Sequence, residues 1–209
     1  MQMRAIMARA PVIPVLTIER ESDAVPLARA LCAGGLTVLE VTLRTPAALA
    51  AISAMRKAVP EAIVGAGTLT LPEDFARVVA AGAQFAVTPG LTEELAVAGR
   101  HAGIPLLPGI ATASELLAAR AASYTALKFF PAEPAGGTAM LASFAPVFAD
   151  VVFCPTGGIT RENASRYLQL KNVACVGGSW IAPAAAVKAG DWAQIEALAR
   201  DAASLARAT

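Results

Sequence analysis

Short apolar runs rich in β-branched residues alternate with alanine-rich stretches of helical periodicity along the chain. The apolar runs predict eight strands, at residues 12–17, 38–43, 63–66, 85–88, 105–107, 126–130, 151–154 and 173–176. The stretches between them predict helices at residues 22–33, 46–59, 72–81, 92–102, 112–121, 137–148 and 161–170. We also expect a closing helix at 192–206 and a short leading helix at 3–9.

Cap signals and regular spacing favour one fold class. Thr45-Pro46 and Thr92-Glu93-Glu94 are typical of helix starts, and Gly34, Gly82 and Gly103 are typical of helix ends. Eight strand–helix units without a Gly-x-Gly-x-x-Gly motif after the first strand favour a (β/α)8 barrel, the TIM-barrel fold, over a nucleotide-binding open sheet. Because no linker or composition shift divides the chain, we expect residues 1–209 to form a single (β/α)8 barrel domain with a short N-terminal helix.

Composition narrows the partners and the compartment. The 209 residues are 56% hydrophobic and 16% charged, with a formal net charge of +1 and scattered Lys and Arg, so we expect neither nucleic acid nor an anionic membrane as a partner. The mean hydropathy of +0.57 is consistent with strands that are buried on both faces. It is also consistent with apolar surface that is buried in an oligomer. With no apolar run of about 18 residues and no signal-peptide pattern, we expect a cytoplasmic protein.

Histidine and cysteine usage excludes several kinds of site. His101 is the one histidine, at the predicted end of a helix, so a zinc site built on several histidines is impossible. Cys32, Cys154 and Cys175 have no CxxC spacing and are expected to be small buried side chains in a reducing compartment. No paired carboxylate cluster suggests a metal, so we expect neither a metal nor a cofactor.

Lys128 interrupts the apolar strand-like run 124–131, whereas the other three lysines lie in or beside polar or helical segments. A buried ammonium is costly, so such a lysine either finds a partner or loses its proton. A neutral lysine amine is a nucleophile that can form a Schiff base with a ketone. The alternative is a strand-end lysine that extends its charged group into water.

The active site of a barrel lies at the carboxyl ends of its strands. Polar residues occur there after several of the other predicted strands. Period two places Glu40, Thr42 and Arg44 on one face of the second strand, so the two charges need each other or a ligand. A purely structural Glu40–Arg44 pair is the alternative. Thr68 follows the third strand, and Pro89 the fourth, where Pro-Gly is also ordinary turn punctuation.

Paired glycines follow the seventh and eighth strands, at Gly157-Gly158 and Gly177-Gly178. Barrels often bind a phosphate there, through backbone N–H groups and a helix N-terminus. The hydroxyl of Ser179 is suitably placed to donate to the same anion. The two glycine pairs therefore favour a phosphate-binding site.

Five motifs together resemble the 2-keto-3-deoxy-6-phosphogluconate (KDPG) aldolase family. They are EVTLRT at 40–45, GAGT at 65–68, KFFPAE at 128–133, CPTGG at 154–158 and GGSW at 177–180. The order and spacing hold along nearly the whole chain. The resemblance implies a class I, Schiff-base aldolase on a trimeric (β/α)8 barrel, and many bacterial members also cleave 4-hydroxy-2-oxoglutarate (KHG).

The resemblance also implies roles for individual residues. Lys128 would form the imine and Glu40 would be the acid and base. The implied substrate contacts are Arg44 and Thr68 at the pyruvyl end with Thr156 nearby, Gly157, Gly158, Gly178 and Ser179 at the phosphate, and Pro89 and Phe130 shaping the pocket. The expected products are pyruvate and glyceraldehyde 3-phosphate.

Two other functions remain compatible with the residues. A phosphate-binding barrel isomerase or epimerase would use acid and base residues without a covalent lysine, and would keep turnover in Lys128→Arg or Lys128→Met. A non-catalytic protein that binds a sugar-acid phosphate would bind ligand without releasing pyruvate.

Overall fold

The computed structural model describes residues 2–207 and has an α/β fold in which the paired strands are parallel. Six strands form one sheet, in the order β5 (Leu106–Leu107), β4 (Ala86–Val87), β3 (Ile63–Gly67), β2 (Val38–Thr42), β1 (Val12–Leu16) and β9 (Val176–Gly178). Three strands form a second sheet, in the order β6 (Gly109–Ile110), β7 (Ala126–Phe129) and β8 (Val152–Pro155). The predicted α/β class is therefore confirmed.

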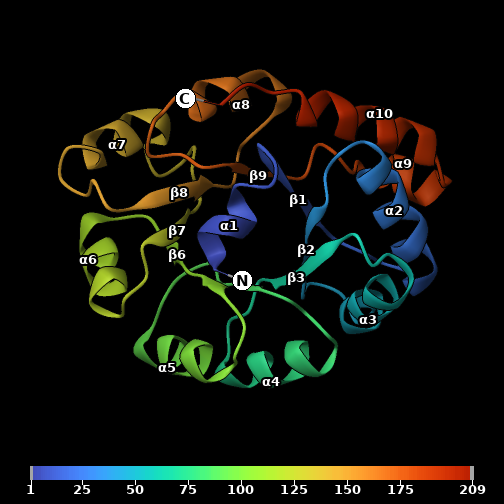
Figure 1. The fold of residues 1–209 in the computed structure, drawn as a ribbon, viewed down its shortest axis with the longest axis horizontal. Helices are drawn as coiled ribbons and strands as arrows, with labels where there is room; N and C mark the ends of the chain where they lie inside the picture. Colours follow the sequence, from blue (N-terminus) through green and yellow to red (C-terminus); the bar gives the residue numbers. More distant parts are fainter. Residues whose placement is uncertain (1, 208–209) are drawn as a thin grey trace.

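Helices surround the strands, which occupy the centre of the view in Figure 1. The helices are α1 (Met3–Met7), α2 (Glu21–Ala33), α3 (Ala48–Ala58), α4 (Pro72–Ala80), α5 (Glu93–His101), α6 (Ala113–Ala121), α7 (Gly137–Phe144), α8 (Arg161–Leu168), α9 (Ala184–Ala189) and α10 (Trp192–Ala203). His101 is exposed and ends α5, as predicted. None of the helices between residues 2 and 207 is both long and apolar enough to cross a membrane.

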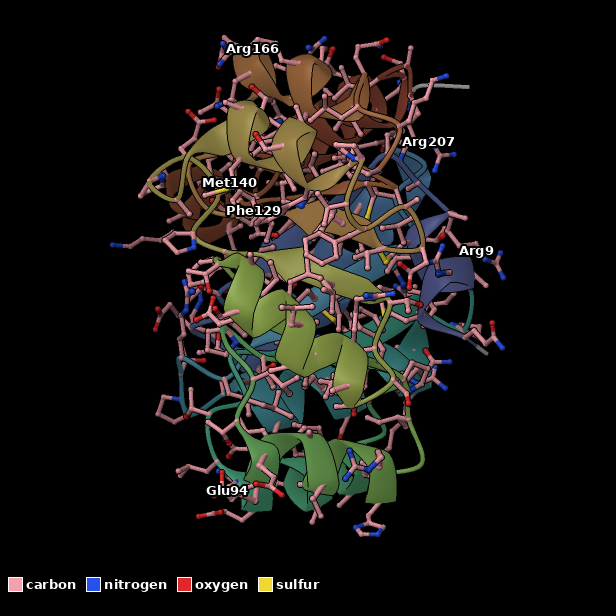
Figure 2. All side chains as sticks on the ribbon, turned by 90° about the vertical axis from the view of Figure 1, so that its left-hand side faces the viewer. Arg9, Glu94, Phe129, Met140, Arg166 and Arg207 are labelled. Carbon is pink, nitrogen blue, oxygen red and sulfur yellow. The ribbon has the colours of Figure 1, made fainter. Side chains whose placement is uncertain are left out.

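Alternation along the strands separates two apolar cores. Leu39, Val41, Leu127 and Phe129 face outward and pack in the larger cluster beneath the helices, where Phe129 lies edge-on to Phe144 with 6.4 Å between ring centroids. Figure 2 shows Phe129 inside the molecule, whereas the labelled charged residues lie at its periphery. The opposite strand faces therefore form an inner layer.

The inner core is a smaller cluster that includes Ile13, Val38 and Ala126 from three strands. Helix α1 contributes Met3, Ile6 and Met7 to this cluster, and Figure 1 shows α1 in front of the strands, near the centre of the view. Because α1 covers this inner layer, the amino-terminal side of the strands is filled with apolar side chains. Polar chemistry is left to the carboxyl side.

Several predicted boundaries were wrong for reasons of backbone chemistry. Among residues 2–207 there are nine strands, not eight, because Pro108 has no N–H for a ladder and separates β5 from β6. Pro146 likewise ends α7 at Phe144 rather than at residue 148. The last strand is β9, Val176–Gly178, and not 173–176, where Val173 forms only an isolated bridge with Phe153. Helix α9 was not predicted.

Candidate active site

Lys128 and Glu40 face each other across the inside of the strands. The alternation that points Ala126 and Val38 into the inner cluster also points Lys128 and Glu40 inward, one pleat nearer the carboxyl ends. The Lys128 Nζ donates to Glu40 Oε1 at 3.1 Å, and the two residues are only 6% and 3% exposed. The structure therefore gives the buried lysine a partner, and does not extend its amine into water.

The predicted alternative of a Glu40–Arg44 pair is wrong. Glu40 pairs with Lys128, whereas Arg44 is exposed and forms no ion pair with any carboxylate among residues 2–207. The reason is that β2 ends at Thr42, so Arg44 lies beyond the strand and opens toward solvent. An unpaired guanidinium at this edge is available to a carboxylate or phosphate ligand.

Glycine at position 67 makes room for the Glu40 carboxylate. A Cβ at Gly67 would lie 2.1 Å from Glu40 Oε1, which is far inside van der Waals contact. The next residue, Thr68, has a φ of 64°, in the left-handed region that a β-branched residue rarely occupies. The carboxyl end of β3 is thus shaped around Glu40, with Thr68 held in a strained conformation directly after it.

A cavity of about 240 Å³ opens at the carboxyl ends of the strands, and neither Lys128 nor Glu40 is among its lining residues. Its lining includes seven of the predicted site residues, namely Arg44, Phe130, Thr156, Gly157, Gly158, Gly178 and Ser179. Phe130 connects the cavity to the pair, because its ring centroid lies 5.4 Å from the Lys128 Nζ, an attractive position for an ammonium. Thr68 and Pro89 are not among the residues that line this cavity; they follow β3 and β4.

The glycine loop after β8 offers a backbone donor to the cavity. Gly157 and Gly158 have φ values of 99° and 79°, which only glycine adopts readily. Among the described residues, no acceptor is found for the N–H of Gly158, whereas the carbonyl oxygens of Gly157 and Gly158 accept from Glu133 N and Asn163 Nδ2. A free backbone N–H in a glycine loop of this kind can bind an anion.

The loop is joined to β9 at the same edge. Thr156 forms a parallel bridge with Gly177, and a Cβ at Gly177 would lie 2.2 Å from Thr156 Oγ1. Gly178 and the exposed Ser179 follow on the same side. The two predicted glycine pairs therefore lie side by side, as a shared anion site requires.

Several residues that contribute to this region were not predicted, among them Val15 and Ile159 in the cavity lining. Thr17 lines the cavity from the end of β1, and period two from Ile13 and Val15 could have found it. Asn163 holds the glycine loop from the first turn of α8, and the capping-box pattern with Thr160 is the sequence signal for it. The residues described contain no group of three or more His, Cys, Asp or Glu side chains placed to hold a metal ion.

A parallel α/β fold with a lysine–carboxylate pair inside the carboxyl ends of its strands defines a class of enzymes that work through a buried amine. The sequence of residues 3–198 matches the family described as KDPG and KHG aldolase. The chain belongs to this family of aldolases, which are carbon–carbon lyases.

Relatives of known structure and name are similar over almost the full chain. The KHG/KDPG aldolase of Escherichia coli K12 is 52% identical over 198 residues, covering 95% of this chain and 93% of the relative. A crystal structure of KDPG aldolase from Legionella pneumophila, with pyruvate captured at low pH as a covalent carbinolamine intermediate, is 50% identical. It has a TM-score of 0.96 and covers 98% of this chain and 99% of that one. The KDPG aldolase of Zymomonas mobilis ZM4 with 3-phosphoglycerate is 48% identical, with a TM-score of 0.93 and coverage of 98% and 96%.

Proposed function

We propose that this chain is a class I aldolase that cleaves KDPG to pyruvate and glyceraldehyde 3-phosphate, and also KHG to pyruvate and glyoxylate. The observation that carries the proposal is the buried Lys128–Glu40 hydrogen bond, 3.1 Å long, which Phe130 links to a cavity lined by Arg44 and the glycine loop. The name of the Escherichia coli relative and the pyruvate carbinolamine of the Legionella pneumophila relative support it.

The reaction begins with the amine of Lys128. Transfer of its proton to Glu40 gives a neutral amine and a neutral carboxylic acid, which removes two buried charges in one step. The amine attacks the C2 ketone and forms a carbinolamine. Glu40 then donates its proton to the C2 oxygen, which leaves as water, and Lys128 becomes a protonated imine.

The imine is the electron sink for carbon–carbon cleavage. Glu40, now a carboxylate, takes the proton of the C4 hydroxyl directly or through one water. The C3–C4 bond breaks, its electron pair moves into the imine to form an enamine, and the aldehyde product leaves. Protonation of the enamine at C3 and addition of water at C2 release pyruvate and restore the Lys128 amine.

We assign the remaining roles from the lining of the cavity and, for Thr68 and Pro89, from the family resemblance alone. Arg44 grips the substrate carboxylate with its planar guanidinium, and Thr68 and Thr156 bind nearby at the pyruvyl end. Gly157, Gly158, Gly178 and Ser179 bind the phosphate through N–H groups and a hydroxyl. Pro89 and Phe130 shape the pocket. The free N–H group at Gly158 supports the phosphate assignment.

We also propose that the two sheets form one closed (β/α)8 barrel in a single domain. β5 and β6 lie directly before and after Pro108, so we count them as one strand that the proline interrupts. The bridges of Phe153 with Val173 and of Thr156 with Gly177 join the β8 side to the β9 side. With β5 and β6 counted as one, the strands number eight in the described chain, as this barrel requires.

We propose a cytoplasmic homotrimer. Large apolar side chains are exposed on or near successive helices α4 to α7, including Leu117 at 55% and Val147 at 68%, and such surface is commonly covered in oligomers. The free thiols of Cys32, Cys154 and Cys175 suit a reducing compartment. Light scattering on the purified protein should give three times the chain mass of 21.3 kDa, and a mass of 21.3 kDa would contradict the trimer.

Borohydride trapping with pyruvate tests the mechanism. We expect one reduced pyruvyl adduct by intact mass, located on Lys128 by peptide mapping and absent in Lys128→Met. Turnover of KDPG should be lost in both Lys128→Met and Lys128→Arg, with circular dichroism to confirm folding. If either variant kept appreciable turnover, or the wild type gave no adduct in excess pyruvate, the Schiff-base mechanism would be wrong.

A further inference from the structure

Thr17 presents a hydroxyl group to the cavity from the end of β1. It follows Ile13 and Val15 in the period-two alternation of β1, and its side chain is exposed, whereas Ile13 is buried and Val15 half-buried. The same side chain lines the 240 Å³ cavity and a neighbouring cavity of about 320 Å³. Thr17 is therefore open to a ligand in the cavity.

The hydrogen bonds of Thr42 fix the role that Thr17 can play. The Thr42 hydroxyl donates to the carbonyl oxygen of Leu16 at 2.9 Å, which uses its one proton. The Oγ1 atoms of Thr17 and Thr42 lie 3.3 Å apart, so in this contact Thr17 must donate and Thr42 must accept. Because its proton is directed at Thr42, the Thr17 Oγ1 presents lone pairs to the cavity. A ligand group that donates a hydrogen bond can therefore bind to it.

The strand order places this acceptor between the two ends of the proposed substrate. β1 lies between β2, which leads to Arg44, and β9, which leads to Ser179. Arg44 is assigned to the carboxylate and Ser179 to the phosphate, so Thr17 faces the carbon chain between them. Anionic groups at either end would be repelled by the Thr17 lone pairs, whereas a chain hydroxyl can donate to them.

We infer that Thr17 is a specificity-determining residue whose Oγ1 accepts a hydrogen bond from the C5 hydroxyl of the sugar-acid phosphate. The C4 hydroxyl must deliver its proton to Glu40 during cleavage, which leaves the C5 hydroxyl as the donor for Thr17. The inference rests on the proposed function. It concerns a hydroxyl that the shorter substrate KHG lacks.

The test is the aldol addition of pyruvate to two aldehydes. Glyceraldehyde 3-phosphate carries the hydroxyl that becomes the C5 hydroxyl, and 3-phosphopropanal lacks it. Thr17→Val removes the acceptor at nearly constant shape, so we expect kcat/KM for glyceraldehyde 3-phosphate to fall roughly three- to tenfold. The value for 3-phosphopropanal should stay unchanged, and Thr17→Ser should retain the preference for glyceraldehyde 3-phosphate.

The controls separate this role from a structural one. Thr37→Val removes a threonine hydroxyl before the start of β2, at the opposite end of the strands, and should alter neither rate. An equal loss with both aldehydes in Thr17→Val, or no loss with either, would overturn the inference while the wild type remains an aldolase. A wild-type protein that adds pyruvate to neither aldehyde would overturn the proposed function and the Thr17 inference together.

Discussion

The side-chain amide of Asn163 donates a hydrogen bond of 2.9 Å to the carbonyl oxygen of Gly158. The same amide accepts from Thr160 N at 2.8 Å, in a capping box at the start of α8. One side chain therefore ties the glycine loop to the first turn of a helix. The Gly158 carbonyl is thereby occupied, whereas its N–H has no acceptor among the described residues.

We predict that Asn163→Ala raises KM for phosphorylated substrates more than it lowers kcat. Without the amide, the loop loses its attachment to α8, and KM for KDPG should rise about three- to tenfold, the effect of one hydrogen bond. KM for KHG, which has no phosphate, should change less. Steady-state kinetics with both substrates and competitive inhibition by inorganic phosphate measure the difference.

Thr160→Ala is the matched control for the Asn163 prediction. It removes the hydroxyl that caps Asn163 N but keeps the bond from Asn163 to Gly158. Both variants should lose about 1 kcal/mol of stability from the cap. Equal KM values for KDPG in the two variants would show that the loop does not depend on Asn163.

Gly67→Ala tests the close packing beneath the Glu40 carboxylate. The added methyl would lie 2.1 Å from Glu40 Oε1, so the carboxylate must move away from Lys128. We expect overpacking to cost about 1–3 kcal/mol of stability, with a loss of kcat. Gly90→Ala, where a Cβ meets nothing within 4 Å, should keep wild-type turnover. Thermal melts measure the loss of stability and KDPG turnover measures the loss of kcat in both variants. A fully active Gly67→Ala variant would contradict the packing argument.

Most of the fold was predictable because the apolar periods of strands and helices are strong in this chain. Two of the errors lie where proline overrides the period. Pro108 and Pro146 interrupt a strand and a helix whose apolar pattern continues past them. Helix α9 was missed because six alanine-rich residues are short, although Pro183 before it and Gly190 after it are boundary signals.

The site was predicted in part for a similar reason. Period two placed Glu40 on one face with Thr42 and Arg44, and the apolar run around Lys128 indicated a buried lysine. Which cation Glu40 meets depends on the position of β7 relative to β2, which no local pattern contains. Arg44 is only four residues from Glu40, yet the partner 88 residues away forms the bond. Period two from Ile13 and Val15 could have placed Thr17 at the mouth of the site, but its contact with Thr42 is visible only in the structure.

Cys32 gives a prediction for alkaline pH. Burial, and then the charge of Glu61, raises the pKa of its thiol from 9.0 to about 11. The thiolate is the reactive form, so alkylation by iodoacetamide at pH 8 should be about a hundredfold slower than for a free thiol. Mass spectrometry over a pH series measures this, with Cys32→Ala as the blank and protein in denaturant as the fast reference.

The same shift has a consequence for stability. Below pH 9 the Cys32 thiol is protonated in both the folded and the unfolded protein. Between pH 9 and about 11 only the unfolded thiol ionises, which favours the unfolded state, so the free energy of unfolding falls as the pH rises. Cys32→Ala should lack that part of the alkaline loss. Rapid alkylation of folded protein at pH 8, or equal alkaline loss in the variant, would contradict the burial of the thiol.

The buried pair itself makes the last prediction, in both activity and stability. Lys128→Met leaves the Glu40 carboxylate buried without a cation, which should cost about 3–5 kcal/mol. Glu40→Gln keeps an oxygen that can accept from Lys128, and we expect kcat to fall about 10²- to 10⁴-fold through loss of the acid and base. The double variant Lys128→Met/Glu40→Gln removes both charges. It should therefore be more stable than Lys128→Met alone and no less active, because a chain without the amine has no imine for Glu40 to serve. Urea unfolding and KDPG turnover of the four proteins complete the cycle, and additive losses in stability would mean that the 3.1 Å contact contributes nothing.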